Sequence, residues 1–331
     1  MKKAKINQTS VLSLTLFFAF ALFIATRNSC DNTDSKTTGR FNEAKSNKDD
    51  LDAALEETAM ANKTLIIAVV NQAYVEGDRP IISIFIDSFW TGEDTRSLVD
   101  HLLVAAMDDM SYARCKFLRL HCFRLETEGV DFSKEKLYMS KGFVKMMWKR
   151  TKFLKDVLKK GYGFIFTDMD VLWLRNPLKQ LSWNDGHDLQ FSTDRFNGDE
   201  LSNLNPINTG FYMVKSNSRT INLFDLWYRK KEHSKGKKEQ DVLREIIDNG
   251  EYKTIGLKIR FLDTRLFSGF CEVSKDAGDV ITFHANCCKS MRAKVADLAE
   301  LSHAWQRYRG NKTATILRSS YVPLCLTVGR T

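Results

Sequence analysis

The amino-acid sequence predicts an α/β domain built on a mainly parallel β-sheet with helices on its faces. Short, continuous apolar runs, which are typical of strands buried on both faces, alternate along the chain with segments of helical periodicity. The chain has 331 residues, of which 43% are hydrophobic and 27% charged, an ordinary composition for a globular protein. With only four prolines and 17 glycines, it leaves little room for long low-complexity regions.

The N-terminal segment differs from the rest of the chain. Three lysines within residues 1–5 precede an apolar stretch at 11–25, and Arg27 closes it. This order of charges favours a retained signal anchor whose N-terminus stays in the cytosol. The stretch falls short of the ~20 residues of a full bilayer crossing, so a cleaved signal peptide is the alternative. The expected organisation is a cytosolic tail at 1–10, a transmembrane signal anchor at 11–26, a polar stem at 27–57 and a single lumenal domain at 58–331.

The domain begins with two predicted buried strands. Residues 64–70 form a β-branched apolar run, and residues 102–107 form a second run that ends at Asp108. The segment 81–90 between them fits either a helix or a strand. Residues 112–125 suggest a short helix followed by a strand.

An amphipathic helix is predicted next. Apolar residues recur at helical spacing from Phe143 to Val157, and Gly161 then ends the helix. Arg150 interrupts the apolar stripe, and an arginine that faces the interior needs an anionic partner. It is expected to pair with a carboxylate or, together with Lys145 of the same helix, to contact a bound anion.

The following strand holds the most informative feature of the chain. The apolar run 164–167 ends in Asp168 and Asp170. In an extended chain, alternate side chains point to the same side, so the two carboxylates can converge. They would repel each other without a cation between them, and Mg²⁺ and Mn²⁺ share such oxygen ligands with substrate phosphates. We therefore expect a metal–diphosphate site; the structural alternative is a helix cap and turn.

The later elements continue the alternation. Ligands of such sheets lie beyond the carboxyl ends of the strands, which is where Asp168 and Asp170 are expected. The sequence predicts strands at 188–192, 211–214, 259–262 and 280–283, and helices that begin at 221–228 and 240–247.

The overall charge indicates which partners the protein favours. The net charge of +9 favours acidic partners such as a nucleotide or an acidic polysaccharide, and nucleic acid is not expected behind a membrane signal. Much of the positive charge lies in residues 229–238, which are predicted to be a solvated loop.

Seven cysteines fit an oxidising lumen, and the absence of any Cys-x-x-Cys pair disfavours zinc. Cys115 and Cys122 are close enough in sequence to pair, whereas the pairing of Cys30, Cys271, Cys287, Cys288 and Cys325 stays open.

Five segments occur in an order that resembles a known family. They are the Phe-Thr-Asp-Met-Asp-Val-Leu-Trp-Leu-Arg-Asn-Pro segment at 166–177, Asn-Thr-Gly-Phe-Tyr at 208–212, Glu-Gln-Asp-Val-Leu at 239–243, Leu-Lys-Ile-Arg-Phe-Leu-Asp-Thr at 257–264 and His-Ala-Asn-Cys-Cys at 284–288. The chain resembles the plant nucleotide-diphospho-sugar transferase family, glycosyltransferase family 77, which includes rhamnogalacturonan xylosyltransferases and extensin arabinosyltransferases. The resemblance extends over residues 58–308.

This resemblance implies a GT-A fold, a single-pass type II protein of the Golgi membrane and a catalytic domain in the lumen. It further implies Mn²⁺ or Mg²⁺, retention of anomeric configuration, and transfer of a pentose or hexose. The donor would be a nucleotide sugar, with UDP-sugars the first choice, and the acceptor a cell-wall polysaccharide or glycoprotein.

The resemblance also implies roles for particular residues. The cation would be held by Asp168 and Asp170, with His284 as a third ligand. Asn208, Gly210, Gln240 and Asp241 would lie around the donor sugar, with Gln240 and Asp241 joining the aspartate pair as candidate catalytic residues. The remaining candidates for substrate binding are Asn71 and Asp108 near the nucleotide base, and Lys145, Arg150 and Lys289 near phosphate or ribose.

Simpler and rival interpretations remain open. An Asn-x-Gly turn at 208–210 and helix capping by Asp241 are the structural alternatives. A haloacid-dehalogenase-type phosphatase would use Asp168 as nucleophile and Asp170 as general acid/base. A relative that binds nucleotide sugars without turnover is the non-enzymatic alternative.

Overall fold

The computed structural model describes residues 47–127, 129–134, 136, 138–181, 183–276, 278–311 and 323–327. The expected tail and signal anchor, most of the stem, and Cys30 lie outside these residues. None of the helices in the described ranges has both the length and the apolar character that a bilayer crossing needs.

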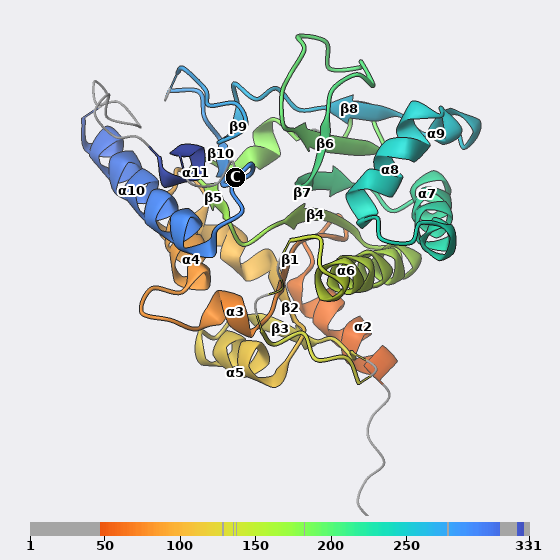
Figure 1. Ribbon diagram of the computed structural model, residues 1–331, viewed down its shortest axis with the longest axis horizontal. Coiled ribbons are helices and arrows are strands. Elements are labelled where there is room, and N and C mark those ends of the chain that lie inside the picture. Colours follow the sequence, from red (N-terminus) through yellow and green to blue (C-terminus); the bar gives the residue numbers. More distant parts are fainter. Residues whose placement is uncertain are drawn as a thin grey trace, which may run out of the picture. The chain divides into compact units, whose positions relative to one another are not determined.

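A large sheet forms the centre of the domain, with the strand order β3-β2-β1-β4-β7-β6-β8 (Figure 1). Only β7 runs against its two neighbours, and every other pairing in the sheet is parallel. The α/β class and the mainly parallel sheet are therefore confirmed. The strands are β1 (Thr64–Val70), β2 (Leu102–Ala106), β3 (His121–Arg124), β4 (Gly163–Thr167), β6 (Leu189–Thr193), β7 (Ile207–Val214) and β8 (Ile259–Phe261).

A small second sheet was not expected as a unit. It has the order β5-β10-β9, from β5 (Val171–Trp173), β10 (Thr282–His284) and β9 (Phe267–Gly269). Each of these strands has three residues, which is too short for a period-two pattern to be recognised in the sequence. The strand expected at 280–283 corresponds to β10.

Helices cover the large sheet, and the ambiguous segment at 81–90 is one of them. The long α10 was not predicted from the sequence. The helices are α2 (Asn47–Thr58), α3 (Gln72–Val75), α4 (Ile81–Thr91), α5 (Asp109–Phe117), α6 (Lys141–Lys159), α7 (Ser218–Arg229), α8 (Glu239–Asp248), α9 (Glu251–Thr254), α10 (Met291–Gly310) and α11 (Leu324–Thr327), with 3₁₀ turns η1 (Arg96–His101), η2 (Pro177–Lys179) and η3 (Lys230–His233).

Both faces of the central strands are buried, which explains their continuous apolar sequences. In β1, Leu65 and Ile67 belong to one core cluster together with residues of α2, α6, α7 and α8. Ile66 and Ala68 face the opposite way and join a second cluster with residues of α4. A third cluster lies between α10 and the small sheet. Because alternate residues of each strand enter different cores, no polar position interrupts the run.

The sheet places polar residues at one edge. The parallel strands β1, β2 and β4 end at neighbouring positions and are followed by Asn71, Asp108 and Asp168. From β1 to β3 the strands are added on one side of β1, and the next strand, β4, pairs with β1 on its other side. The direction in which strands are added therefore reverses at β1. Such a reversal of strand order opens a crevice beyond the carboxyl ends of the strands, where ligands bind.

The last part of the segment expected as stem, residues 47–57, forms a helix of the domain. The compact unit that contains the sheet begins at Ser46, and α2 lies within it. Leu51 and Leu55 of α2 are buried in the core cluster beneath β1 and β2. The helical spacing of these leucines was visible in the sequence, but the polar residues around them hid their burial.

We predict that Leu55→Ala destabilises the whole domain, because Leu55 is fully buried. The expected loss is about 2–5 kcal/mol of unfolding free energy, measured by chemical denaturation. Glu56→Ala, an exposed neighbour on the same helix, is the control and should change stability by less than about 0.5 kcal/mol. Equal stability of both variants would mean that α2 is not part of the folded core.

Candidate active site

The two aspartates lie in a turn between β4 and β5. The amide of Asp168 donates to the carbonyl of Gly210 at 2.6 Å, and the amide of Val171 donates back to the carbonyl of Asp168 at 3.3 Å. Met169 between them is buried in the core. The carboxylates therefore converge because the chain turns, and not because it is extended as the sequence suggested.

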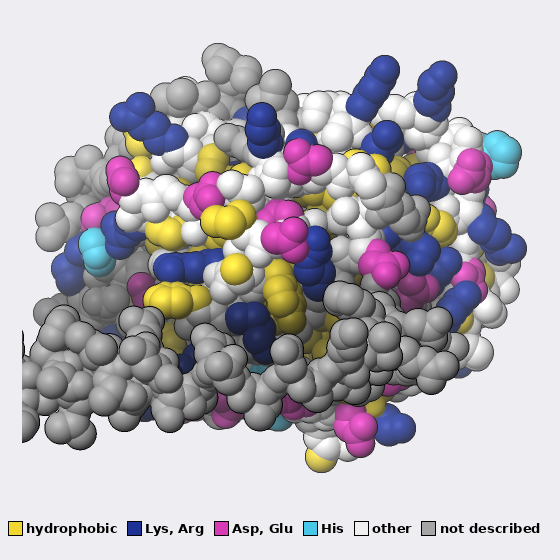
Figure 2. Space-filling model, turned by 90° about the horizontal axis from the view of Figure 1, so that it is seen from below, with side chains coloured by type: hydrophobic (Ala, Val, Ile, Leu, Met, Phe, Trp, Pro, Cys, Tyr) yellow, Lys and Arg dark blue, Asp and Glu magenta, His cyan; other side chains and the backbone are white. Residues whose placement is uncertain are grey.

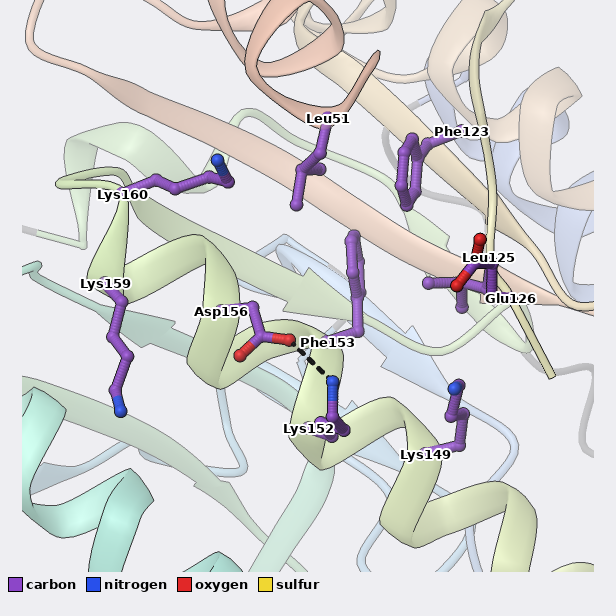
Figure 3. A pocket seen from close by; sticks show the side chains of 10 residues that line it. All are labelled: Leu51, Phe123, Leu125, Glu126, Lys149, Lys152, Phe153, Asp156, Lys159 and Lys160. Carbon is purple, nitrogen blue, oxygen red and sulfur yellow. Dashed lines mark hydrogen bonds and ion pairs between the residues drawn. The ribbon is translucent and has the colours of Figure 1, made fainter. Parts of the chain in front are cut away.

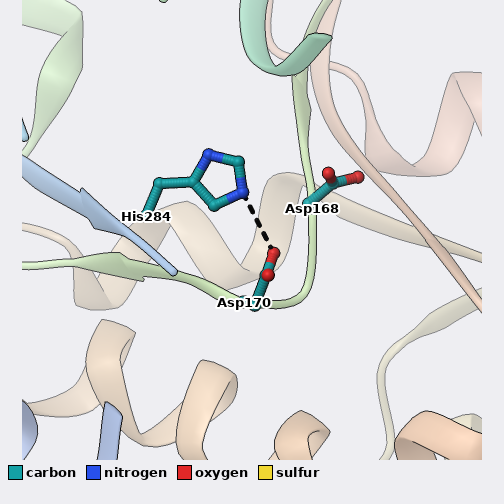
Figure 4. Close-up of side chains that lie close together, drawn as sticks. All are labelled: Asp168, Asp170 and His284. Carbon is teal, nitrogen blue, oxygen red and sulfur yellow. Dashed lines mark ion pairs between the residues drawn. The ribbon is translucent and has the colours of Figure 1, made fainter. Parts of the chain in front are cut away.

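His284 reaches the same point through the small sheet. The antiparallel register of β5 and β10 places His284 opposite Val171, and the amide of Ala285 donates to the carbonyl of Asp170 at 2.9 Å. The imidazole Nε2 lies 3.2 Å from Asp170 Oδ1 (Figure 4). One ligand atom from each of Asp168, Asp170 and His284 lies within 4.8 Å of the others. We call these three residues the acid–histidine cluster.

Gly210 allows the backbone of β7 to lie very close to this cluster. A Cβ at this position would lie 2.3 Å from His284 Cε1 and 2.7 Å from Asp168 Oδ2. Real Cβ atoms do not approach other atoms so closely, so no other residue fits here without movement of the ligands. Gly210 and Asn208 lie inside β7, so the interpretation of Asn-x-Gly as a turn is wrong.

Lys294 of α10 completes the surroundings of Asp170. Its Nζ lies 2.7 Å from Asp170 Oδ2. Burial by itself would raise the pKa of Asp170, but Lys294 and His284 hold that pKa well below its usual range. Burial lowers and Asp170 raises the pKa of His284, and the net direction is upward. Asp170 is thus an anion in contact with two basic groups.

Arg150 is buried between two carboxylates. Its guanidinium donates to Asp168 Oδ1 at 2.8 Å and to Glu239 Oε1 at 2.6 Å, and it lies over the ring of Phe166. Burial alone would lower its pKa, yet Asp168 and Glu239 raise it and keep the group charged. Of the two alternatives for Arg150, the structure shows pairing with carboxylates, so it orients Asp168 and does not present a free cation.

Gln240 and Asp241 lie in the first turn of α8. Gln240 Oε1 accepts from the amide and the hydroxyl of Thr209, both at 3.0 Å. This contact fixes α8 against β7 next to Gly210. The helix is capped at Lys238, so Asp241 is not the capping residue. It is half-buried in the first turn, where an acid suits the helix dipole.

Asn208 belongs to a network of amides around Asp194. Its Nδ2 donates to Asp194 Oδ1 at 2.7 Å, and its Oδ1 accepts from the amide of Gly210 at 2.8 Å. Asn286, two residues after His284, donates to the same Asp194 oxygen at 3.0 Å. Asn208 is therefore joined both to the backbone of Gly210 and to a carboxylate that the sequence analysis did not select.

The residues expected near the nucleotide base have structural contacts of their own. Asp108 caps α5 through Ser111 at 2.8 Å and accepts from the amide of Gln72 at 2.7 Å. Asn71 donates to the carbonyl of Phe132 at 2.7 Å. Its Oδ1 is buried and has no hydrogen-bond partner in the described part of the chain.

Two candidate lysines are exposed. Lys289 lies between the acid–histidine cluster and α10, directly after Cys288. Lys145 is exposed on α6, about 140° around the helix from Arg150. The side chain of Lys145 therefore does not lie beside that of Arg150, which is buried and pairs with Asp168.

Disulfides join segments on either side of the cluster. The expected pair Cys115–Cys122 is present, and the pairs left open are Cys271–Cys287 and Cys288–Cys325. The last two attach the segment after His284 to the end of β9 and to α11. They restrict the freedom of the His284 loop in the unfolded chain as well as in the native one.

Positive charge is distributed over the described part of the chain, and some of it is paired with acids. On the face in Figure 2, lysine and arginine side chains lie among acidic ones. The lysine-rich segment after α7 forms η3, and Lys230 pairs with Glu251 at 2.9 Å while Lys237 pairs with Glu245. The expected solvated loop is thus partly ordered by acids of α8 and α9.

A separate cavity of about 530 Å³ lies between α2, β3 and α6 (Figure 3). Its floor includes Leu51 and Phe153, and at its rim Lys152 pairs with Asp156 at 3.1 Å. None of the cluster residues lines it, so it is distinct from the site beyond β4.

Several residues of the site were missed by sequence analysis. Lys294 comes from the unpredicted α10, and it contacts an aspartate 124 positions earlier. Glu239 stands beside Gln240 and Asn286 two residues after His284, both within the segments that carry the family resemblance. Asp194 follows a predicted strand end, and that position was the available signal.

The donor set suits a hard divalent cation. Two carboxylates and one imidazole are ligands that Mn²⁺ and Mg²⁺ accept, and Gly210 lets the backbone of β7 lie close to them. A cation site beyond the carboxyl end of a mainly parallel sheet is typical of enzymes that bind phosphorylated substrates.

Residues 97–298 match the family described as nucleotide-diphospho-sugar transferase, and the chain belongs to that family. It is therefore a glycosyltransferase that uses nucleotide-diphospho-sugars. This membership excludes the phosphatase alternative.

The chain is similar to proteins of a plant and, in its structure, to a protein of mouse. The uncharacterized Arabidopsis thaliana protein At1g28695 is 47% identical over 307 residues, which cover 91% of this chain and 89% of that protein. The β-arabinofuranosyltransferase RAY1 of Arabidopsis thaliana is 26% identical over 232 residues, which cover 66% of this chain and 41% of RAY1. The crystal structure of mouse xyloside xylosyltransferase 1 aligns with 69% of this chain and 99% of that chain, at 13% identity and a TM-score of 0.43.

We predict that Gly210→Ala weakens Mn²⁺ binding by roughly 10-fold or more, because the added methyl displaces Asp168 and His284. Mn²⁺ binding is measured by electron paramagnetic resonance, and circular dichroism checks the fold. Gly310→Ala is the control, since a Cβ there meets no atom within 4 Å. Unchanged Mn²⁺ affinity in Gly210→Ala would show that the cation binds elsewhere.

Proposed function

We propose that the protein is a metal-dependent, retaining glycosyltransferase that moves a pentose or hexose from a UDP-sugar to a cell-wall polysaccharide or glycoprotein. The observation that supports this most directly is the convergence of Asp168, Asp170 and His284 within 4.8 Å beyond β4. Family membership supplies the class of donor, and the cluster supplies a means to bind its diphosphate.

Asp168, Asp170 and His284 would hold Mn²⁺ or Mg²⁺. When bound, such a cation acts as a Lewis acid on the diphosphate leaving group. Arg150 fixes the Asp168 carboxylate from behind, and the β5–β10 register fixes His284 relative to Asp170. The protein therefore presents the ligands in a set arrangement, which lowers the cost of ordering them on binding.

Glycosyl transfer breaks the bond between the sugar C1 and the β-phosphate oxygen, and the electron pair stays on the phosphate. A new bond forms between C1 and the acceptor hydroxyl oxygen, whose proton passes to the departing phosphate in a same-face substitution. Lys294, held at Asp170, is placed to contact the phosphate charge that develops, and Lys289 is a second candidate. Gln240 and Asp241 are proposed to lie beside the donor sugar.

The donor and acceptor classes rest on different grounds. Asn71 Oδ1, at the end of β1, accepts no hydrogen bond from the described residues and suits an imino N–H of uracil. Asp108 lies at the end of the neighbouring β2. RAY1 is named as a β-arabinofuranosyltransferase, so UDP-arabinofuranose is a first donor to test. A plant wall polymer is the corresponding acceptor.

We also propose that the protein acts in the Golgi lumen as a single-pass type II membrane protein. The three disulfides of the described residues suit an oxidising compartment. The proposed order is a cytosolic tail at 1–10, a membrane anchor at 11–26 and a stem that ends where α2 begins.

The alternative is a relative that binds the nucleotide sugar without turnover. Binding of UDP with Mn²⁺ and no transfer to any wall-polymer acceptor would favour it. The intact cluster favours the enzyme, since every proposed cation ligand is present and oriented.

We predict that Asp168→Asn and Asp170→Asn each reduce Mn²⁺-dependent hydrolysis of the donor sugar on the order of 100-fold or more, because several kcal/mol of charge stabilisation are lost. The assay measures UDP release from a panel of UDP-pentoses and UDP-hexoses. The exposed Asp87→Asn should keep the activity of the original protein. Full activity in both site variants would rule out this site.

We further predict that Lys294→Met acts on cation and nucleotide in opposite directions. Lys294 neutralises the carboxylate that is proposed to hold the cation, so its removal should strengthen Mn²⁺ binding without nucleotide. It should weaken UDP binding by roughly 10-fold, the scale of a lost charge-assisted hydrogen bond. Calorimetry measures both affinities, with the exposed Arg292→Met as control. Equal weakening of both would instead indicate a structural role for Lys294.

A further inference from the structure

Asp194 has an unusual environment for a carboxylate in this domain. It follows the last residue of β6 and is half-buried. Its Oδ1 accepts from Asn208 Nδ2 at 2.7 Å and from Asn286 Nδ2 at 3.0 Å. Two neutral amides therefore hold one oxygen, and no ion pair of Asp194 occurs within the described ranges.

The two amides are themselves fixed in orientation. Asn208 Oδ1 accepts from the amide of Gly210 at 2.8 Å, and Asn286 Oδ1 accepts from the amide of Cys271 at 3.1 Å. Because backbone N–H groups occupy the oxygen ends, the NH₂ ends must face Asp194. The carboxylate is thus held in one position by groups that cannot rotate freely.

This network touches the acid–histidine cluster. The point where a Cβ of Gly210 would lie is 2.9 Å from Asn208 Oδ1, 2.7 Å from Asp168 Oδ2 and 2.3 Å from His284 Cε1. Asn286 is two residues beyond His284. Asn208 therefore contacts Asp194 with one end of its amide and, with the other, the backbone of Gly210 beside the cluster.

Other buried carboxylates nearby have cationic partners. Asp168 and Glu239 share Arg150, and Asp170 has Lys294. An anion held by amides alone keeps a negative charge that solvent or a ligand can contact. The second oxygen, Oδ2, has no hydrogen-bond partner from the described residues and can accept from hydroxyl groups.

We propose that Asp194 Oδ2 binds a hydroxyl group of the sugar being transferred and selects a neutral sugar over a uronic acid. The inference rests on the proposed function, since it requires a sugar nucleotide at the cluster. A carboxylate forms strong, charge-assisted hydrogen bonds to hydroxyl donors. The same charge repels the carboxylate of a uronic acid, which gives selectivity by exclusion. Asp194 is a substrate-binding residue in this account and takes no proton in the reaction.

The test separates binding of the sugar from binding of the nucleotide. Calorimetry with Mn²⁺ compares UDP with UDP-arabinofuranose, UDP-galactose and UDP-glucuronic acid. In Asp194→Asn the new amide oxygen can keep both bonds to Asn208 and Asn286, while an NH₂ donor replaces the Oδ2 acceptor. The affinity for UDP should stay within about twofold. The gain in affinity from a neutral sugar should fall roughly 10-fold or more, and the disadvantage of UDP-glucuronic acid should shrink.

Controls keep the outcomes distinct. Asp199→Asn, an exposed acid on the same β6–β7 connection, should match the original protein in every affinity, and melting temperatures check that both variants fold. Equal weakening of UDP and UDP-sugars in Asp194→Asn would make Asp194 structural and overturn the proposal. Unchanged donor affinities with a raised KM for the acceptor would assign it to the acceptor instead, which also overturns it. If the original protein bound no UDP with Mn²⁺, the proposed function itself would fail.

Discussion

The site depends on the balance of charge around the end of β4. The carboxylates of Asp168, Asp170 and Glu239 lie near one another at this point. Arg150 and Lys294 contact them at 2.6–2.8 Å, and His284 lies 3.2 Å from Asp170. Breaking one such buried pair leaves an uncompensated charge, which is far more costly than the pair is favourable. The positions of α6, α8 and α10 are therefore tied to the carboxylates that they serve.

Backbone geometry sets the second constraint. Gly210 brings β7 so close to Asp168 that the amide of the aspartate donates to the Gly210 carbonyl at 2.6 Å. The small sheet then aligns Asp170 with His284 through a single antiparallel register. The ligands that follow β4 and the ligand on β10 thus converge beside β7 through main-chain pairing, which holds atoms more narrowly than long side chains can.

Local sequence patterns were enough to predict the strands and the first ligands, but not their partners. The apolar run at 164–167 predicts a buried strand that ends at Asp168, because this prediction needs only neighbouring residues. Lys294 could not be found in this way, since its contact with Asp170 spans 124 positions. Asn71 and Asp108 stand at the correct edge of the sheet, yet their contacts with Phe132 and Ser111 became visible only in three dimensions.

The carboxylates around β7 divide into two kinds. Glu239 is 2% exposed and saturated by Arg150 and Thr209 at one oxygen, so its charge stabilises the scaffold. Asp194 is half-buried and held by amides alone, so its negative charge is not cancelled locally. A charge that the protein leaves uncancelled can interact only with solvent or with a ligand. The proposed cation would face the diphosphate of the donor. On the β6–β7 side, Asp194 would then contact the neutral sugar, which offers hydroxyl groups. The proposed site therefore matches a nucleotide sugar in two parts: the cation ligands suit the charged diphosphate, and Asp194 suits the uncharged sugar ring.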